Sequence, residues 1–372
     1  MSSWGNYLKI SIFGESHGGG IGVVMDGLPA GEFIDREALL LQMGRRAPGK
    51  DKAATPRSEA DTPEILSGLL NDTTTGAPLC AVIRNTNTRS QDYGNVLSCP
   101  RPSHADYTGF VRYHGFNDIR GGGHFSGRLT APLVFAGAVA RQILARRGIR
   151  IAAHISSVGA LTDSRFDPVQ IPADLVERLS TTTFGLIDTD KEIPMRALIE
   201  EHRQQGDSIG GTIECAITGM PAGVGSPMFG GVENVLSSIL FGIPAVKGIE
   251  FGTGFEGTLL SGHEHNDAFR YDGDTVRTVT NHNGGILGGI STGQDIVVRM
   301  ALKPTSSITI PGKTINLQGE ETDIVTKGRH DPCVGIRAVP IAEAMLALVL
   351  MDHFMRNRAQ CADVVCGTPK IA

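Results

Sequence analysis

The chain has 372 residues, of which 40% are hydrophobic and 20% are charged, and its formal net charge is −5. This balance is typical of a globular protein with a large core, and it argues against a general nucleic-acid-binding role. With no apolar run of the roughly 20 residues that span a membrane, no signal-like N-terminus and no CxxC pair, the chain is expected to be reduced, cytoplasmic and without a membrane partner.

Strand-like and helical runs alternate along the chain and predict a mixed α/β fold. Helices are expected from a cap at Asp35 to Arg46, over 129–147 and over 340–358, and the last two are apolar enough to be buried. The expected strands are rich in Ile and Val and are bounded by Gly, Pro or Asn: 7–13, 20–26, 79–84, 149–156, 209–218, 247–252, 294–302 and 307–310.

The first strand runs into a glycine-rich turn that carries Glu15, Ser16 and His17. Because glycines leave the imidazole uncovered and its ordinary pKa is about 6.5, His17 suits proton transfer to a ligand. A solvated turn histidine is the alternative. His104, within the stretch RPSHADYTG, has the same two interpretations.

A second glycine-rich turn, 120–123, leads into the helix expected at 129–147. Backbone N–H groups at a helix N-terminus favour anions, so this turn predicts either a phosphate site or a packing turn. The sequence has no Walker A lysine here, and Arg128 could bind a carboxylate or phosphate with two hydrogen bonds.

Basic residues cluster in three further segments. The segment 44–61 contains Arg45, Arg46, Lys50, Lys52 and Arg57, and is either a solvated loop or a lid over an anion. The segment 301–314 supplies Lys303 and several hydroxyls, and 327–340 supplies Arg329, His330, Asp331 and Arg337. His263 and His265 have no further ligands at a suitable spacing, so no metal site is expected.

Three pieces of sequence occur twice in the same order, which indicates either an ancient duplication or chance similarity. The expected halves are 1–160 and 205–360, related by a pseudo-twofold axis and joined by 160–205, within a single domain of residues 1–360 followed by a tail at 361–372. The paired pieces are 18–31 with 210–223, 73–90 with 290–307, and 127–140 with 336–349.

Seven motifs, in order from about residue 4 to about residue 360, resemble the chorismate synthase family. They are GESHG at 14–18, RSQDY at 89–93, HADYT at 104–108, RGGG at 120–123, GGILGGIS at 284–291, KPTSS at 303–307 and RHDPCVGIRAVPIAEAM at 329–345.

The resemblance implies an α+β fold, a β-α-β sandwich built from two pseudo-symmetric halves, that assembles as a homotetramer. It also implies a phosphate lyase that converts 5-enolpyruvylshikimate 3-phosphate to chorismate by an anti 1,4-elimination. Reduced FMN is the implied cofactor although there is no net redox change, and NADPH is a possible reductant of that flavin. The short chain favours an enzyme that does not reduce its own flavin.

By the same resemblance, His17, His104 and Asp331 are the catalytic residues, and Arg46, Arg128 and Arg337 bind substrate. Arg46 and Lys52 match positions assigned to NADP. The implied FMN-binding residues are His124, Phe125, Ser126, Pro244, Ala245, Gly288, Lys303, Pro304, Thr305, Ser306, Ser307 and Arg329.

One departure from the family pattern lies in the loop after the triple glycine. The family commonly has Arg-Ser-Ser-x-Arg-Glu-Thr-Ala there, whereas this chain has His124-Phe125-Ser126-Gly127-Arg128-Leu129-Thr130-Ala131. The side-chain contacts of this loop to flavin are therefore open. Two other functions are also open: a different flavin enzyme, and a non-enzymatic protein that binds anions or RNA through the basic segment 45–57.

Overall fold

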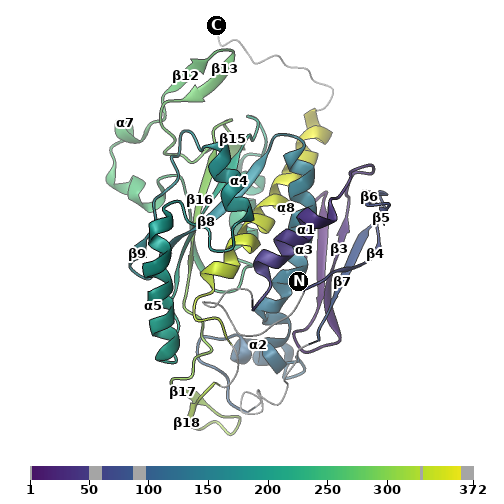
Figure 1. Cartoon of the computed structure of the whole chain (residues 1–372), viewed down its shortest axis with the longest axis vertical. Coiled ribbons are helices and arrows are strands. Elements are labelled where there is room, and N and C mark those ends of the chain that lie inside the picture. Colours follow the sequence, from purple (N-terminus) through teal and green to yellow (C-terminus); the bar gives the residue numbers. More distant parts are fainter. Residues whose placement is uncertain (1, 50–60, 87–97, 327–329, 362–372) are drawn as a thin grey trace.

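The computed structural model describes residues 2–49, 61–86, 98–326 and 330–361. In these residues, two five-stranded antiparallel sheets enclose a layer of helices, which is the expected β-α-β sandwich (Figure 1). One hydrophobic core fills the space between the sheets and includes residues of both sheets and of the enclosed helices.

The first sheet has the strand order β1-β2-β3-β7-β4. Ile21, Val23 and Met25 are fully buried and alternate along β3, because successive side chains of a strand point to opposite faces. The strands are β1 (Ser3–Trp4), β2 (Lys9–Gly14), β3 (Gly20–Asp26), β4 (Glu64–Ser67) and β7 (Leu79–Arg84), beside a small hairpin of β5 (Leu69–Leu70) and β6 (Thr73–Thr74).

The second sheet has the strand order β11-β16-β10-β8-β9 and is covered on both faces. Ile296 and Val298 of β16 face the helices, whereas Val297 belongs to a smaller cluster on the outer face. This two-sided burial explains the nearly continuous apolar run of that strand. The strands are β8 (Arg150–Val158), β9 (Leu161–Thr162), β10 (Gly211–Thr218), β11 (Val246–Phe251) and β16 (Ile296–Leu302).

Two long apolar helices, α3 (Thr130–Ala145) and α8 (Gly335–Cys361), lie together at the centre (Figure 1). The α8 helix is long and apolar enough to cross a membrane, but 89% of its most apolar window is buried inside the protein. Beside them lie α1 (Arg36–Arg46), capped by the Asp35 side chain on the N–H groups of Glu37 and Ala38, and α6 (Val232–Leu240).

The remaining elements lie outside this sandwich. The α4 helix packs near β8, and Val176 and Leu179 of α4 contribute to the outer cluster. These elements are α2 (Asp106–Tyr113), α4 (Ala173–Thr181), α5 (Glu192–Gln204), α7 (Gly262–His265), and the hairpins β12 (Phe269–Asp272) with β13 (Thr275–Thr278), β14 (Ile286–Leu287) with β15 (Ile290–Ser291), and β17 (Gly312–Ile315) with β18 (Glu321–Ile324).

Most predicted elements are confirmed within a few residues. The strand predicted at 307–310 is wrong, because the chain leaves the sheet after Leu302 and the Ser307 hydroxyl instead accepts a hydrogen bond from Arg101. The helix predicted at 340–358 begins earlier, at Gly335, so that Pro340 lies inside it. The sequence analysis did not predict the helices α2, α4, α5, α6 and α7.

The two sheets repeat one topology. The order β2-β3-β7-β4 matches β8-β10-β16-β11, with α1 and α6 at equivalent points of the chain and α3 and α8 as the final helices. Because β8 pairs with β10, the repeated unit of the second sheet includes β8, which begins at Arg150, and 160–205 lies between these two strands. The matching topology supports the predicted duplication, which stays a proposal.

Candidate active site

A cavity of about 620 Å³, hereafter the main cavity, lies where the two central helices begin. Thr130 of α3 and Arg337 of α8 line it, together with Arg46 at the end of α1. Helix N-termini carry partial positive charge, so two of them converging on one cavity favour an anionic ligand. The other walls come from the loops 101–105, 121–129, 241–247 and 303–307.

The triple-glycine turn separates the two predicted catalytic histidines. A Cβ atom on Gly121 would lie 2.5 Å from the His17 imidazole, and one on Gly122 would lie 3.4 Å from His104. Both glycines have positive φ angles, 61° and 85°, which side-chain-bearing residues rarely adopt. His104 lines the main cavity; His17 is not part of its lining but contacts it through Gly121.

Two buried groups orient His104. Asp106 accepts hydrogen bonds from His104 Nδ1 at 2.7 Å and from Arg101 Nε at 2.7 Å. Burial alone would raise the pKa of Asp106, but the hydrogen bonds from Arg101 and His104 hold it well below its usual range. Asp106 is therefore ionised, and it leaves the Nε2 atom of His104 to face the glycine turn.

The loop that carries His104 is tied to the predicted flavin-binding loop 303–307. Arg101 NH1 donates to the Ser307 hydroxyl at 3.1 Å, and Lys303 Nζ donates to the Ser103 carbonyl. Burial, followed by the charge of Lys247, lowers the pKa of Lys303. These contacts join two segments that lie some 200 residues apart into one wall of the main cavity.

Two predicted substrate-binding arginines share one buried carboxylate. Arg46 and Arg128 both pair with Asp61, and all three side chains are almost completely buried. Burial is the main cause that lowers the pKa of Arg46 to about 9, and the positive charge of Arg337 is the next. Arg46 is still charged at neutral pH. Arg46 also donates to the Gly127 carbonyl and the Thr130 hydroxyl, so its guanidinium group is held firmly at the start of α3.

Arg337 is the more accessible of the predicted substrate ligands. Its NH1 pairs with the predicted catalytic Asp331 at 2.7 Å, its Nε donates to the Arg46 carbonyl, and 17% of its side chain is exposed. In the described residues, six cationic side chains line the main cavity, and four of them pair with three carboxylates. The excess of three positive charges suits a ligand with several negative charges.

The loop that departs from the family pattern makes internal contacts. His124 Nδ1 bonds the Gly14 carbonyl at 2.8 Å and its Nε2 bonds the Ser2 hydroxyl at 2.7 Å, so the imidazole ties this loop to the N-terminal strands. The Phe125 ring lies 6.3 Å from that of Tyr113. Ser126 caps the following turn by accepting from the Arg128 N–H. All three line the main cavity, although the polar side-chain atoms of His124 and Ser126 make hydrogen bonds within the fold.

Most of the other predicted cofactor residues also line the main cavity. Ala245 has a positive φ angle of 77°, unusual for a residue other than glycine, and its carbonyl accepts the Lys303 N–H. Gly288 lies elsewhere, in the turn between β14 and β15. Lys52 and Arg329 lie outside the described residues. The lining positions are Pro244, Ala245, Lys303, Pro304, Thr305, Ser306 and Ser307.

The structure also adds site residues to which the sequence analysis gave no role. Arg101 and Lys247 line the main cavity, and Asp61 and Asp106 hold its charged groups in place. The Ser16 hydroxyl is fully buried beside the Gly121 position and has no hydrogen-bond partner in the described part of the chain. Arg101 and Asp106 flank His104 in one short motif, so the sequence could have indicated that both residues contact this histidine.

Known proteins resemble this chain over almost its whole length. The profile of the chorismate synthase family matches residues 8–355. A chorismate synthase of Burkholderia thailandensis is 46% identical over 369 residues, covering 99% of this chain and 96% of its own. One from Paraburkholderia phymatum is also 46% identical, covering 99% and 97%. A crystal structure of a chorismate synthase, 27% identical, has a TM-score of 0.75 and covers 95% of this chain and 93% of its own.

Proposed function

This chain belongs to the chorismate synthase family, and from that premise we propose that its main cavity binds 5-enolpyruvylshikimate 3-phosphate together with reduced FMN. The activity is that of a carbon–oxygen lyase: phosphate leaves C3, a proton leaves C6, and chorismate results with no net redox change. The observation that carries the assignment of the cavity is its excess of three positive charges at two converging helix N-termini.

The substrate carries two carboxylates and a phosphate, which the cationic wall can bind with charge-assisted hydrogen bonds. Arg337 is the most exposed of the three arginines and contacts the substrate directly. The buried Arg46 and Arg128 attract the anionic substrate through their positive charge. Ile12, Leu133 and Val334 give the cavity an apolar side. In such a partly desolvated site, charged contacts are stronger than in water.

His17 donates a proton to the departing phosphate. Phosphate is a moderate leaving group, and a proton on its oxygen makes C–O cleavage easier. The contact of the imidazole with Gly121 puts this acid at the edge of the main cavity. The buried Ser16 hydroxyl beside it supplies a further hydrogen bond to an anion at this edge.

His104 and Asp331 handle protons on the other side of the site. Asp106 fixes the His104 ring through Nδ1, so that proton exchange takes place at Nε2. Asp331, paired with Arg337, is the carboxylate that assists removal of the C6 proton. These roles rest on the match of the residues to the family motifs and on their positions around one cavity.

The cavity suits a flavin by its volume, by its cations and by the positive-φ residues that bring backbone close to a ligand. A bound reduced flavin would supply the transient electron density that loss of the phosphate and of the C6 proton requires. Lys303 and the backbone of 303–307 and 244–245 would hold it, with Ser126 and the backbone of His124 and Phe125 opposite. Gly288 and Arg329 stay predictions for this role.

We extend the proposal to the wider setting of the enzyme. It acts as a cytoplasmic homotetramer on a small-molecule substrate, without a nucleic-acid or membrane partner. It takes up flavin that is already reduced, so its activity does not depend on NADPH. For an enzyme that binds NADPH, Arg46 and Lys52 are the positions implied by the family. The support is the family resemblance and, for the reductant, the shortness of the chain.

The decisive experiment measures phosphate release under anaerobic conditions from 5-enolpyruvylshikimate 3-phosphate. We expect release only when photoreduced FMN is supplied, and no flavin reduction when oxidised FMN and NADPH are supplied instead. The His17→Ala variant should bind FMN normally and turn over about 10² to 10⁴ times more slowly. Equal rates with and without reduced FMN would refute the proposal.

A further inference from the structure

A second cavity of about 460 Å³ lies beside α1, whose Ala38 and Gln42 line it. We call it the α4 cavity, because α4 forms one wall, opposite α3 and α1, with the start of β8 and Thr218 between them. It shares no lining residue with the main cavity. The neighbouring residues Arg45 and Arg46 diverge: Arg46 lines the main cavity, and Arg45 joins the polar network behind the α4 cavity.

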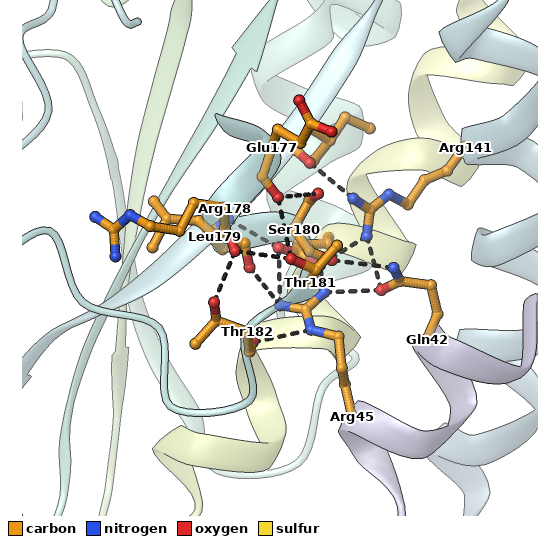
Figure 2. Close-up of polar contacts among 12 residues, drawn as sticks. Gln42, Arg45, Arg141, Glu177, Arg178, Leu179, Ser180, Thr181 and Thr182 are labelled. Atoms are coloured by element: carbon orange, nitrogen blue, oxygen red, sulfur yellow. Dashed lines mark hydrogen bonds and ion pairs between the residues drawn. The ribbon is translucent and has the colours of Figure 1, made fainter. Parts of the chain in front are cut away.

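That network contains two arginines but only one buried carboxylate. Arg45 and Arg141 both pair with Glu343 of α8, whose side chain is 0% exposed. Figure 2 shows the two guanidinium groups close together beside Gln42, which accepts a hydrogen bond from each. The three charged groups therefore carry one net positive charge in a largely desolvated place, where an uncompensated charge is costly.

No other carboxylate of the cavity neutralises this charge. Glu177 of α4 makes no ion pair with either arginine in the part of the chain that the structure describes, and Figure 2 draws its carboxylate away from both. Arg178 points away from the cluster and donates to the carbonyls of Leu186 and Ile187. An anion is thus the missing partner.

The two arginines differ in what they offer to a ligand. Arg45 is 1% exposed and is occupied by α4, because it donates to the carbonyls of Leu179 and Thr182 (Figure 2). Arg141 is 15% exposed and lines the cavity. It uses three of its five N–H donors, on Gln42, Glu343 and the Ile151 carbonyl. Two donors are left for a molecule in the cavity.

The rest of the lining combines a small apolar surface with polar side chains, among them Gln142, Arg150 and Glu177. Ala38, Ala138 and Ala145 keep the space open, and Ile149 and Val176 complete an apolar surface around it. The hydroxyls of Ser180 and Thr181 lie at the rim but already donate to carbonyls within α4. A ligand that fits therefore has one anionic end and a compact apolar body.

We propose that the α4 cavity is a second ligand site, which binds a small carboxylate with a compact apolar body through Arg141. The carboxylate accepts the two spare N–H donors of Arg141 and neutralises the excess charge of the Arg45–Glu343–Arg141 network. The site is independent of flavin and of the elimination chemistry.

The probe is benzoate, and the matched control ligand is benzyl alcohol, which has a similar shape without the charge. Calorimetric titration in chloride-free buffer should show saturable benzoate binding at a stoichiometry of one per chain. Benzyl alcohol should bind at least about tenfold more weakly, since hydrogen bonds to a charged group are the stronger kind. Titrations with saturating FMN present should give the same benzoate affinity.

Two variants separate this site from adventitious binding. Thr181→Trp changes an exposed rim residue, so the protein should fold normally, and the indole should abolish benzoate binding. Arg141→Lys keeps the charge but loses the planar fork, and should weaken binding about tenfold. The proposal is overturned if benzoate does not bind saturably, if FMN competes with it, if benzyl alcohol binds equally well, or if folded Thr181→Trp binds it unchanged.

Discussion

A Cβ atom on Gly121 would lie 2.5 Å from Nε2 of His17. The imidazole of the first glycine-rich turn therefore occupies the place of a side chain in the second turn. Gly121 also has a φ of 61°, so both space and backbone conformation require glycine there. The two turns, more than 100 residues apart in the chain, form one structure at the edge of the main cavity.

The first prediction tests this contact. Gly121→Ala should force His17 away from the cavity and lower turnover about 10²-fold, because a displacement of about 1 Å at a catalytic group has that effect. The matched control is Gly19→Ala in the same turn as His17, where a Cβ would meet nothing within 4 Å. Steady-state turnover with reduced FMN is the measurement, with circular dichroism to check folding. Wild-type turnover in Gly121→Ala would contradict the proposed role of His17.

The second prediction concerns the orientation of His104. Asp106→Asn keeps the size of the side chain but removes the charge that holds His104 Nδ1 and Arg101. Turnover should fall about 10²-fold with an altered pH profile, the usual scale for a misplaced acid–base group. The control is Thr108→Ala in the same turn, where only an exposed hydrogen bond to the Ala105 carbonyl is lost. An unchanged pH–rate profile would show that Asp106 does not act through His104.

The third prediction concerns the buried carboxylate shared by Arg46 and Arg128. Burial raises the pKa of Asp61, but the charges and hydrogen bonds of the two arginines lower it more, so the net shift is downward. Asp61 therefore stabilises the fold as long as it is ionised. Asp61→Asn should lower the free energy of unfolding by about 3 to 5 kcal/mol, because two buried cations lose their partner.

Added phosphate should restore part of that stability, since an anion in the main cavity can replace the lost charge. Urea unfolding with and without phosphate measures both effects. The control is Glu256→Gln, which breaks the exposed pair with Arg165 and should cost less than about 1 kcal/mol. Similar losses in the two variants would contradict the assignment of a buried ion cluster.

The fourth prediction concerns an alternating row of charges on the outer face of the second sheet. Glu250, Arg299, Glu214 and His154 are neighbours across four adjacent strands, and Asp163 bonds the far side of His154. Burial lowers the pKa of His154, but its hydrogen bonds to Asp163 and then Glu214 raise it more, so the net shift is upward.

A raised pKa means that His154 stabilises the folded state fully below its ordinary value of 6.5, and that this contribution is lost as pH rises through the folded-state pKa. The difference in unfolding free energy between wild type and His154→Gln should therefore be largest in mildly acidic buffer and shrink in alkaline buffer. Urea unfolding across that range is the measurement. A difference that grows with pH would show that His154 is neutral in the folded protein.

Local pattern was enough to predict the central elements. Asp35 caps α1 as expected, because a carboxylate before a helix accepts the first free N–H groups. The alternation of apolar residues in β3 follows from the burial of one face of the strand. The continuous apolar run of α3 follows from burial of the helix on all sides. The strand expected at 307–310 failed, because its β-branched residues lie in a loop held by Arg101 and Gly206 rather than in a sheet.

The sequence by itself determined the family and the glycine turns, and most of the site residues predicted from it line the main cavity, because these predictions depend on motifs of a few adjacent residues. Only the tertiary structure decided which charges meet. Arg45 and Arg46 are adjacent and chemically identical, yet one pairs with Glu343 and the other with Asp61. Successive residues of a helix point about 100° apart, so the partners of each are set by the elements packed on that side, which no local pattern contains.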